Sequence, residues 1–137
     1  MVRELLATEL PAVLDADALF ELQPTVRSSP TVLTPHEGEL ARLLGEESGW
    51  VAAHRLEAVQ RAAAKFSCTV LLKGADSLVC APDGAVLVVS LGPPSLAVAG
   101  TGDVLTGVTA TMAMSSEETF GPIAGIGRFA SEEEAVR

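Results

Sequence analysis

The stretch VLTPHEGELARLLG, residues 32–45, changes from one secondary-structure pattern to another within a few residues. Its start completes an apolar run, Thr31 to Leu33, that is typical of a short buried strand. The next four residues, TPHE, have the composition of a capping box with Thr34 as N-cap and a proline at the first helical position. We therefore expect a helix from Pro35 to about Gly45. A strand that leads directly into a helix is typical of the α/β class.

The same alternation of strand and helix patterns continues on both sides of this stretch. A brief helix through Leu19 and Leu22 and a longer one from about Trp50 to Phe66 are expected. The apolar face of the longer helix comprises Ala52, Leu56, Val59, Ala63 and Phe66. Further strands are predicted at Ala12 to Leu14, Thr69 to Leu72, Ser77 to Ala81 and Ala85 to Ser90, with a turn at Pro82 to Gly84.

Size and composition indicate one compact unit and exclude some functions. The chain has 137 residues, 48% of them hydrophobic, and a net charge of −9. Because no run of Lys or Arg offsets this charge, we expect no binding to nucleic acid. The first residues lack the pattern of a secretory leader, and no apolar run is long enough to span a membrane. Cys68 and Cys80 lie in apolar runs and are expected to be buried thiols of a cytosolic protein.

Polar residues follow the predicted strands at the points where they end. Asp15 and Asp17 follow the first strand, Thr34 to Glu37 the second, and Lys73 to Ser77 the third. In a parallel sheet these positions share one edge, so we expect them to converge. Asp15 and Asp17 are candidate Mg²⁺ ligands through water, although Asp17 also suits a helix start.

Two residues at this edge are candidates for ligand binding, each with a simpler alternative. The ammonium group of Lys73 could reach a phosphate, although lysines at strand ends are more often simply solvated. His36 could donate to a ligand, although an exposed histidine at a helix start is equally typical.

A second glycine-rich stretch, AGTGDVL at residues 99–105, precedes an apolar helical pattern. Backbone N–H groups at the start of a helix attract anions, and glycines allow phosphate oxygens to approach them closely. Asp103 would then be a carboxylate beside a bound anion, placed to accept a proton. The same letters are also typical of an ordinary turn and helix start.

Four motifs taken together resemble a known family. They are VLDADAL (13–19), VLTPHEGELARLLG (32–45), VLLKGADSLVCAPDG (70–84) and AGTGDVLTG (99–107). In this order they resemble the carboxyl-terminal half of the bacterial ADP-dependent (S)-NAD(P)H-hydrate dehydratases of the ribokinase-like superfamily. The resemblance implies a partial ribokinase-like three-layer sandwich with a mostly parallel sheet, formed by residues 1–137 as a single partial nucleotide-binding domain.

The resemblance also implies a reaction and its residues. ADP would phosphorylate the hydroxyl of hydrated NADH or NADPH, and loss of phosphate would restore the double bond, with AMP and phosphate as by-products. His36 and Asp103 would contact the hydrate, with Asp103 as the catalytic base. The nucleotide would be held by Lys73, Gly74, Ala75, Asp76, Ser77 and Gly102, and the anion hole would be Gly100, Thr101 and Gly102. ADP or ATP would be the phosphoryl donor together with Mg²⁺, whose ligands the sequence does not assign.

Two other functions remain open at this point. A ribokinase-like small-molecule kinase would use Asp103 in the same way, although the nearest vitamin-precursor kinases usually carry cysteine in its place. A non-catalytic nucleotide-binding or assembly fragment is the other alternative. We expect a cytoplasmic homo-oligomer, because exposed sheet edges favour pairing with another chain.

Overall fold

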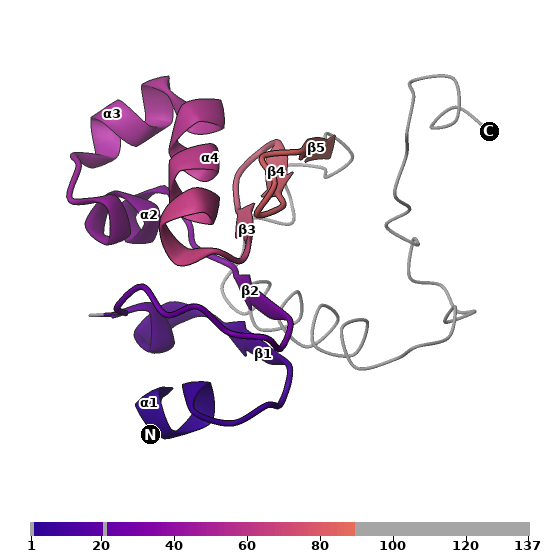
Figure 1. Ribbon diagram of the computed structural model, residues 1–137. Coiled ribbons are helices and arrows are strands. Elements are labelled where there is room, and N and C mark those ends of the chain that lie inside the picture. The colour runs from indigo at the N-terminus through magenta and orange to yellow at the C-terminus, as the bar shows by residue number, and fades with distance from the viewer. Residues whose placement is uncertain (1, 21, 90–137) are drawn as a thin grey trace, which may run out of the picture.

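The computed structural model describes residues 2–20 and 22–89, which form a five-stranded sheet and the helices packed against it (Figure 1). The strands are β1 (Ala12–Leu14), β2 (Thr31–Leu33), β3 (Thr69–Leu72), β4 (Ser77–Cys80) and β5 (Val86–Val89). The helices are α1 (Val2–Leu6), the 3₁₀ helix η1 (Ala16–Leu19), α2 (Glu37–Leu44), α3 (Ser48–Ala53) and α4 (Arg55–Phe66). The five predicted strands are confirmed, whereas the brief helix after β1 ends before Leu22.

The strands lie side by side in sequence order, β1-β2-β3-β4-β5. The first three strands are parallel, and β3, β4 and β5 are antiparallel. The α/β class is confirmed, but only the first three strands match the expected mostly parallel sheet. The connections explain the difference: residues 15–30 and 34–68 are long enough to return to a parallel neighbour, whereas residues 73–76 and 81–85 only reverse the chain.

The helices α2, α3 and α4 form a layer against the sheet, in which α4 contacts β3 and β4 (Figure 1). The core between sheet and helices includes Leu14, Leu33, Val70, Leu72, Leu40, Val51, Val59, Ala62 and Phe66. Each fully buried large apolar side chain contributes roughly 1.5–3 kcal/mol to stability. The described residues therefore contain the sheet and one helical layer of the expected sandwich.

Both faces of β3 are buried, as its uninterrupted apolar run predicts. Val70 and Leu72 have no exposed surface and belong to the core beneath α4. Leu71 alternates with them, so it points to the opposite face, and it is only 5% exposed.

Helix α2 begins two residues later than the sequence predicts. The N-cap is His36 rather than Thr34, and the capping box is formed by His36 and Glu39. Thr34 is fully buried, and its backbone N–H donates to the carbonyl of Leu14, which continues the pairing of β2 with β1. This ladder bond keeps Thr34 extended, so it cannot cap the helix. The predicted end at Gly45 is confirmed, because Gly45 is the left-handed C-cap.

The single helix expected from Trp50 to Phe66 is divided in two at His54. His54 has φ −129° and ψ 42°, so it ends α3 and precedes α4. Val59, Ala63 and Phe66 are buried as expected, whereas Ala52 in α3 is exposed and Leu56, in the first turn of α4, is 53% exposed. The buried residues of α4 are Ala58, Val59, Ala62, Ala63 and Phe66.

The hairpin and the two thiols match their predictions. Gly84 adopts φ 87°, and its N–H donates to the carbonyl of Ala81. Cys68 and Cys80 are buried free cysteines. The glycine-rich stretch at residues 99–105, the helix expected after it and the chain beyond lie outside the described residues. Across residues 2–20 and 22–89, no helix has both the length and the apolar character needed to cross a membrane.

Candidate functional site

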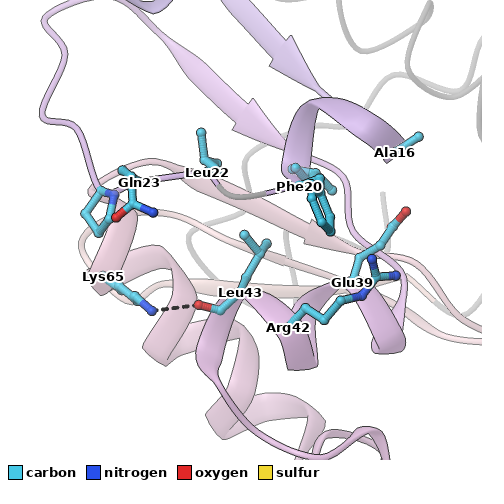
Figure 2. Close-up of a pocket in the computed structure, with 10 residues that line it drawn as sticks. Ala16, Phe20, Leu22, Gln23, Glu39, Arg42, Leu43 and Lys65 are labelled. Atoms are coloured by element: carbon cyan, nitrogen blue, oxygen red, sulfur yellow. Dashed lines mark hydrogen bonds between the residues drawn. The ribbon is translucent and has the colours of Figure 1, made fainter. Parts of the chain in front are cut away.

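Two hollows in the described part of the chain do not coincide with the predicted site. One hollow of about 570 Å³ lies between the segment after η1 and the helices α2 and α4 (Figure 2). Phe20 and Leu43 line it, and Lys65 at its rim donates to the carbonyl of Leu43. A second hollow of similar volume lies between α1 and the segment that follows η1. Neither hollow includes Lys73 or His36, so the candidate site is defined by the polar side chains that follow the strands.

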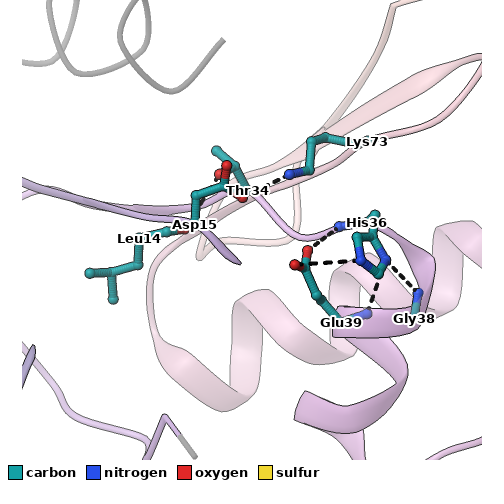
Figure 3. Close-up of polar contacts among 7 residues, drawn as sticks. All are labelled: Leu14, Asp15, Thr34, His36, Gly38, Glu39 and Lys73. Carbon is teal, nitrogen blue, oxygen red and sulfur yellow. Dashed lines mark hydrogen bonds and ion pairs between the residues drawn. The ribbon is translucent and has the colours of Figure 1, made fainter. Parts of the chain in front are cut away.

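Three strand ends meet at one edge of the sheet, as the sequence predicts. Because β1, β2 and β3 are parallel, the residues that follow them are neighbours in space (Figure 3). The ammonium Nζ of Lys73, after β3, lies 2.7 Å from Oδ1 of Asp15, after β1. Neighbouring strands are about 4.8 Å apart, so the lysine spans the width of β2 to reach this partner.

Backbone hydrogen bonds hold the three strand ends in a fixed arrangement. The N–H of Thr34 donates to the carbonyl of Leu14 at 3.0 Å. The N–H of Lys73 donates to the carbonyl of Pro35 at 2.9 Å. Because each end is bonded to its neighbour, the edge forms a rigid platform for the side chains above it.

The pairing of Lys73 with Asp15 is the contact that sequence reasoning missed. The two side chains are 22% and 12% exposed, so the ion pair is largely removed from water. The sequence analysis placed Asp15 and Lys73 at the same edge, as a candidate metal ligand and a candidate phosphate contact, but did not predict that they pair with each other. The order of the strands in the sheet, which the sequence does not give, brings these two side chains close enough to form an ion pair.

His36 lies at the same edge and its imidazole ring is held in one orientation (Figure 3). Nδ1 accepts hydrogen bonds from the N–H groups of Gly38 and Glu39, at 3.0 Å and 3.2 Å. Glu39 in return accepts the backbone N–H of His36 at 2.8 Å. Since Nδ1 is an acceptor, the neutral ring carries its proton on Nε2. Nε2 lies 3.4 Å from Oε1 of Glu39, and the side chain is 55% exposed, so part of the ring is accessible to a ligand.

The segment Lys73 to Ser77 connects β3 to β4 beside this platform. Gly74, Ala75 and Asp76 are exposed, whereas Lys73 and Ser77 are partly buried. The carbonyl of Asp76 accepts a hydrogen bond of 2.6 Å from Nη2 of Arg55, a residue the sequence analysis did not single out. The segment is therefore an anchored loop whose backbone is open to solvent.

The remaining predicted site residues are Asp17 and those at positions 100–103. Asp17 is exposed in the first turn of η1. Gly100, Thr101, Gly102 and Asp103 lie outside the described residues. Within the described ranges there is no group of three or more His, Cys, Asp or Glu side chains that could hold a metal ion.

Comparisons with known proteins identify the relatives of this chain. A family model described as NAD(P)H-hydrate dehydratase matches residues 1–130. The bifunctional NAD(P)H-hydrate repair enzyme Nnr of Moorella thermoacetica is 44% identical over 119 residues, covering 82% of this chain and 22% of that enzyme. The ADP/ATP-dependent NAD(P)H-hydrate dehydratase of Bacillus subtilis, co-crystallised with ATP and Mg²⁺, shows 35% identity and a TM-score of 0.77. That match covers 82% of this chain and 40% of the Bacillus chain.

A ribokinase-like superfamily protein of Enterococcus faecalis is similar at 26% identity and a TM-score of 0.65, over 80% of this chain and 39% of that one. The chain thus spans less than half the length of each of these proteins. The structural matches show that the fold is ribokinase-like. Because the family model covers nearly the whole sequence, the chain belongs to the NAD(P)H-hydrate dehydratase family.

Proposed function

We propose that this protein takes part in the ADP-dependent dehydration of (S)-NADH hydrate and (S)-NADPH hydrate, a repair of damaged nicotinamide cofactors. The observation that carries the proposal is the convergence of His36, Lys73 and the loop after β3 at one edge of the sheet. This edge brings together two motifs, TPHEGE and KGADS, through which the chain resembles the family. We call residues 73–77 the nucleotide loop from here on.

In the proposed reaction, ADP transfers its terminal phosphoryl group to the hydroxyl oxygen of the hydrated ring. The proton of that hydroxyl passes to the carboxylate of Asp103, and AMP is the leaving group. The phosphate ester then eliminates phosphate while the ring loses a proton, which restores the double bond of NADH or NADPH. The net products are the repaired cofactor, AMP and phosphate.

Each predicted residue has a role in this proposal. His36 contacts the hydrate through the accessible side of its ring. The nucleotide loop and Gly102 bind the adenine nucleotide, and the N–H groups from Gly100 to Gly102 stabilise charge on the transferring phosphoryl group. Lys73, the first residue of the loop, reduces the negative charge of this acidic protein near the phosphates.

Magnesium is part of the proposal because the similar Bacillus enzyme was crystallised with ATP and Mg²⁺. The described residues supply no cluster of metal ligands, and the best placed carboxylate, Asp15, is paired with Lys73. We therefore expect the ion to enter bound to the nucleotide phosphates, as Mg²⁺ commonly does. We also propose that the chain is one partial domain of a cytoplasmic homo-oligomer, which the partly exposed strand β5 supports.

The test is an absorbance assay for reduced nicotinamide, with the purified chain, NADPH hydrate, Mg²⁺ and either ADP or ATP. We expect recovery of NADPH absorbance that depends on ADP, and AMP formed in equal amount. Asp103→Asn is expected to abolish turnover while leaving nucleotide binding nearly intact, because it removes only the base.

The outcomes separate the candidate functions. No recovery, with a full-length relative active in parallel, would contradict the proposal for this chain. Phosphorylation of another small-molecule hydroxyl without dehydration would indicate a kinase. Turnover unchanged in Asp103→Asn would exclude Asp103 as the base.

A further inference from the structure

Arg55, the first residue of α4, joins two segments that the proposed function assigns to different ligands. Its Nη1 forms an ion pair with the carboxylate of Glu37, at the start of α2. Its Nη2 donates a hydrogen bond of 2.6 Å to the carbonyl of Asp76. One side chain therefore connects the start of α2, next to His36, with the nucleotide loop.

Gly74 allows the guanidinium group of Arg55 to lie directly against the nucleotide loop. A Cβ atom at residue 74 would lie 2.4 Å from Nη2, 2.5 Å from Nη1 and 2.8 Å from Cζ of Arg55. These separations are far below ordinary van der Waals contact, which begins near 3.5 Å for carbon atoms. A side chain at residue 74 would displace the guanidinium group, so the present position of Arg55 depends on the glycine.

An arginine suits this position better than a lysine would. The planar guanidinium presents several donors in a fixed fork, so it reaches a carboxylate and a carbonyl at the same time. The Arg55 side chain is only 23% exposed, so water competes weakly for these bonds. A lysine ammonium would keep the attraction to Glu37 but could not reproduce the flat contact with Gly74.

The nucleotide loop is restrained at both ends, and Arg55 supplies one restraint. At the β3 end, the backbone of Lys73 is bonded to Pro35 and its ammonium to Asp15. At the β4 end, the carbonyl of Asp76 is bonded to Arg55. The backbone between them is exposed, so losing the second restraint would free that part of the loop.

From these contacts we infer that Arg55 is a positioning residue, which holds the nucleotide loop against α2 in the conformation that receives the adenine nucleotide. It acts through Gly74 and Asp76 rather than on the reacting atoms. The inference rests on the proposed function, which assigns this loop to the nucleotide. Because Arg55 also holds Glu37, it couples the nucleotide side of the site to the substrate side.

The test compares Arg55→Gln and Arg55→Lys with the unchanged protein in ADP binding and in hydrogen exchange of the amides of the nucleotide loop. We expect ADP to bind about tenfold more weakly to Arg55→Gln, since a charge-assisted hydrogen bond is lost. The loop amides should exchange faster. In turnover, KM for ADP should rise while kcat at saturating ADP changes little.

Arg55→Lys separates positioning from simple stability. The lysine retains the attraction to Glu37, so the melting temperature should stay close to that of the unchanged protein. ADP affinity should nevertheless fall nearly as far as in Arg55→Gln, because the contact with Gly74 and Asp76 is lost. A lysine variant with normal ADP affinity would contradict the inference.

Arg61→Gln is the matched control. Arg61 lies on the same helix, donates to Glu46 at 3.0 Å and lies over the Trp50 ring, remote from the nucleotide loop. Its replacement removes an ion pair of the same kind but should leave ADP affinity and loop exchange unchanged. Gly74→Ala should displace the guanidinium and reproduce the Arg55→Gln effect, and the double variant should be no weaker than either single one.

The outcomes of this test do not depend on the dehydratase reaction. If Arg55→Gln and Gly74→Ala both match the unchanged protein in ADP affinity and loop exchange, the inference is wrong. If the unchanged protein binds ADP but does not dehydrate, the proposed function fails while affinity and exchange still decide the role of Arg55. If it binds no ADP, loop exchange alone decides, and unchanged exchange in Arg55→Gln overturns the inference.

Discussion

The parallel half of the sheet and its hairpin differ in what they bring together at their ends. At the ends of β1, β2 and β3, Asp15 pairs with Lys73 and Thr34 bonds to Leu14, contacts between residues far apart in the sequence. At the turn between β4 and β5, Asp83 accepts from the backbone N–H of Ala85, two residues away, and the carbonyl of Gly84 accepts from the side-chain amide of Gln60 in α4. The ends of the parallel strands join side chains of opposite charge from distant segments, whereas the turn between β4 and β5 is closed by a hydrogen bond within itself. The candidate site therefore lies on the parallel side.

The largest expected effect on the free energy of unfolding separates a buried residue of the parallel half from an exposed residue of the hairpin. Leu72→Ala removes a fully buried side chain at the end of β3 and should lower the free energy of unfolding by about 3 kcal/mol. Val88→Ala in β5, where the residue is 57% exposed, should change it by less than about 0.5 kcal/mol. Chemical denaturation of both variants measures the contrast, and equal losses would mean that the hairpin is as well packed as the parallel half.

The two buried thiols, one next to β3 and one in β4, make the stability of the protein depend on pH. Burial raises the pKa of Cys68, directly before β3, from 9.0 to about 11. Burial, together with the nearby Asp83 carboxylate, also raises the pKa of Cys80 at the end of β4. A raised folded-state pKa means that the stabilisation is complete below pH 9.0 and is lost as pH rises towards about 11.

For Cys68 this loss should amount to about 2 to 3 kcal/mol, at about 1.4 kcal/mol per unit of pKa. Denaturation measured across this pH range should show a steep fall in the unchanged protein and a flatter one in Cys68→Ser. Below pH 9.0 the native thiol should resist alkylating reagents. Equal pH slopes in the two proteins would show that Cys68 does not govern alkaline stability.

The smallest expected effect on stability concerns the ion pair at the site. Lys73→Ala leaves the Asp15 carboxylate largely out of water without its partner, so it should cost about 1 to 2 kcal/mol of unfolding free energy. It should also weaken ADP binding by about tenfold, if Lys73 faces the phosphates as proposed. Denaturation and ADP titration measure the two effects.

The double variant Asp15→Asn with Lys73→Met is the control for this prediction. It removes both charges, so the stability lost in Lys73→Ala should largely return while ADP affinity stays low. If Lys73→Ala binds ADP with unaltered affinity, Lys73 serves only as the partner of Asp15.

Errors in the sequence analysis occurred where local patterns competed with contacts to distant residues. The capping-box pattern predicted Thr34 as the N-cap of α2. The hydrogen bond from Thr34 to Leu14 keeps Thr34 in the sheet, so His36 is the N-cap instead. The apolar face that included Ala52 and Leu56 assumed one continuous helix, but the helix is broken at His54 and both of these residues are exposed. Neither event can be detected in a local window of sequence.

The sequence by itself determined the strands, the hairpin turn at Gly84, the end of α2 at Gly45 and the motifs that place the chain in its family. These features follow from hydrophobic periodicity and backbone preferences, which act over a few residues. Tertiary structure alone decided that Lys73 pairs with Asp15 across β2 and that Arg55 lies on Gly74. Such contacts depend on strand order and on how α4 meets the sheet, because only packing brings segments so far apart in the chain within reach of a hydrogen bond.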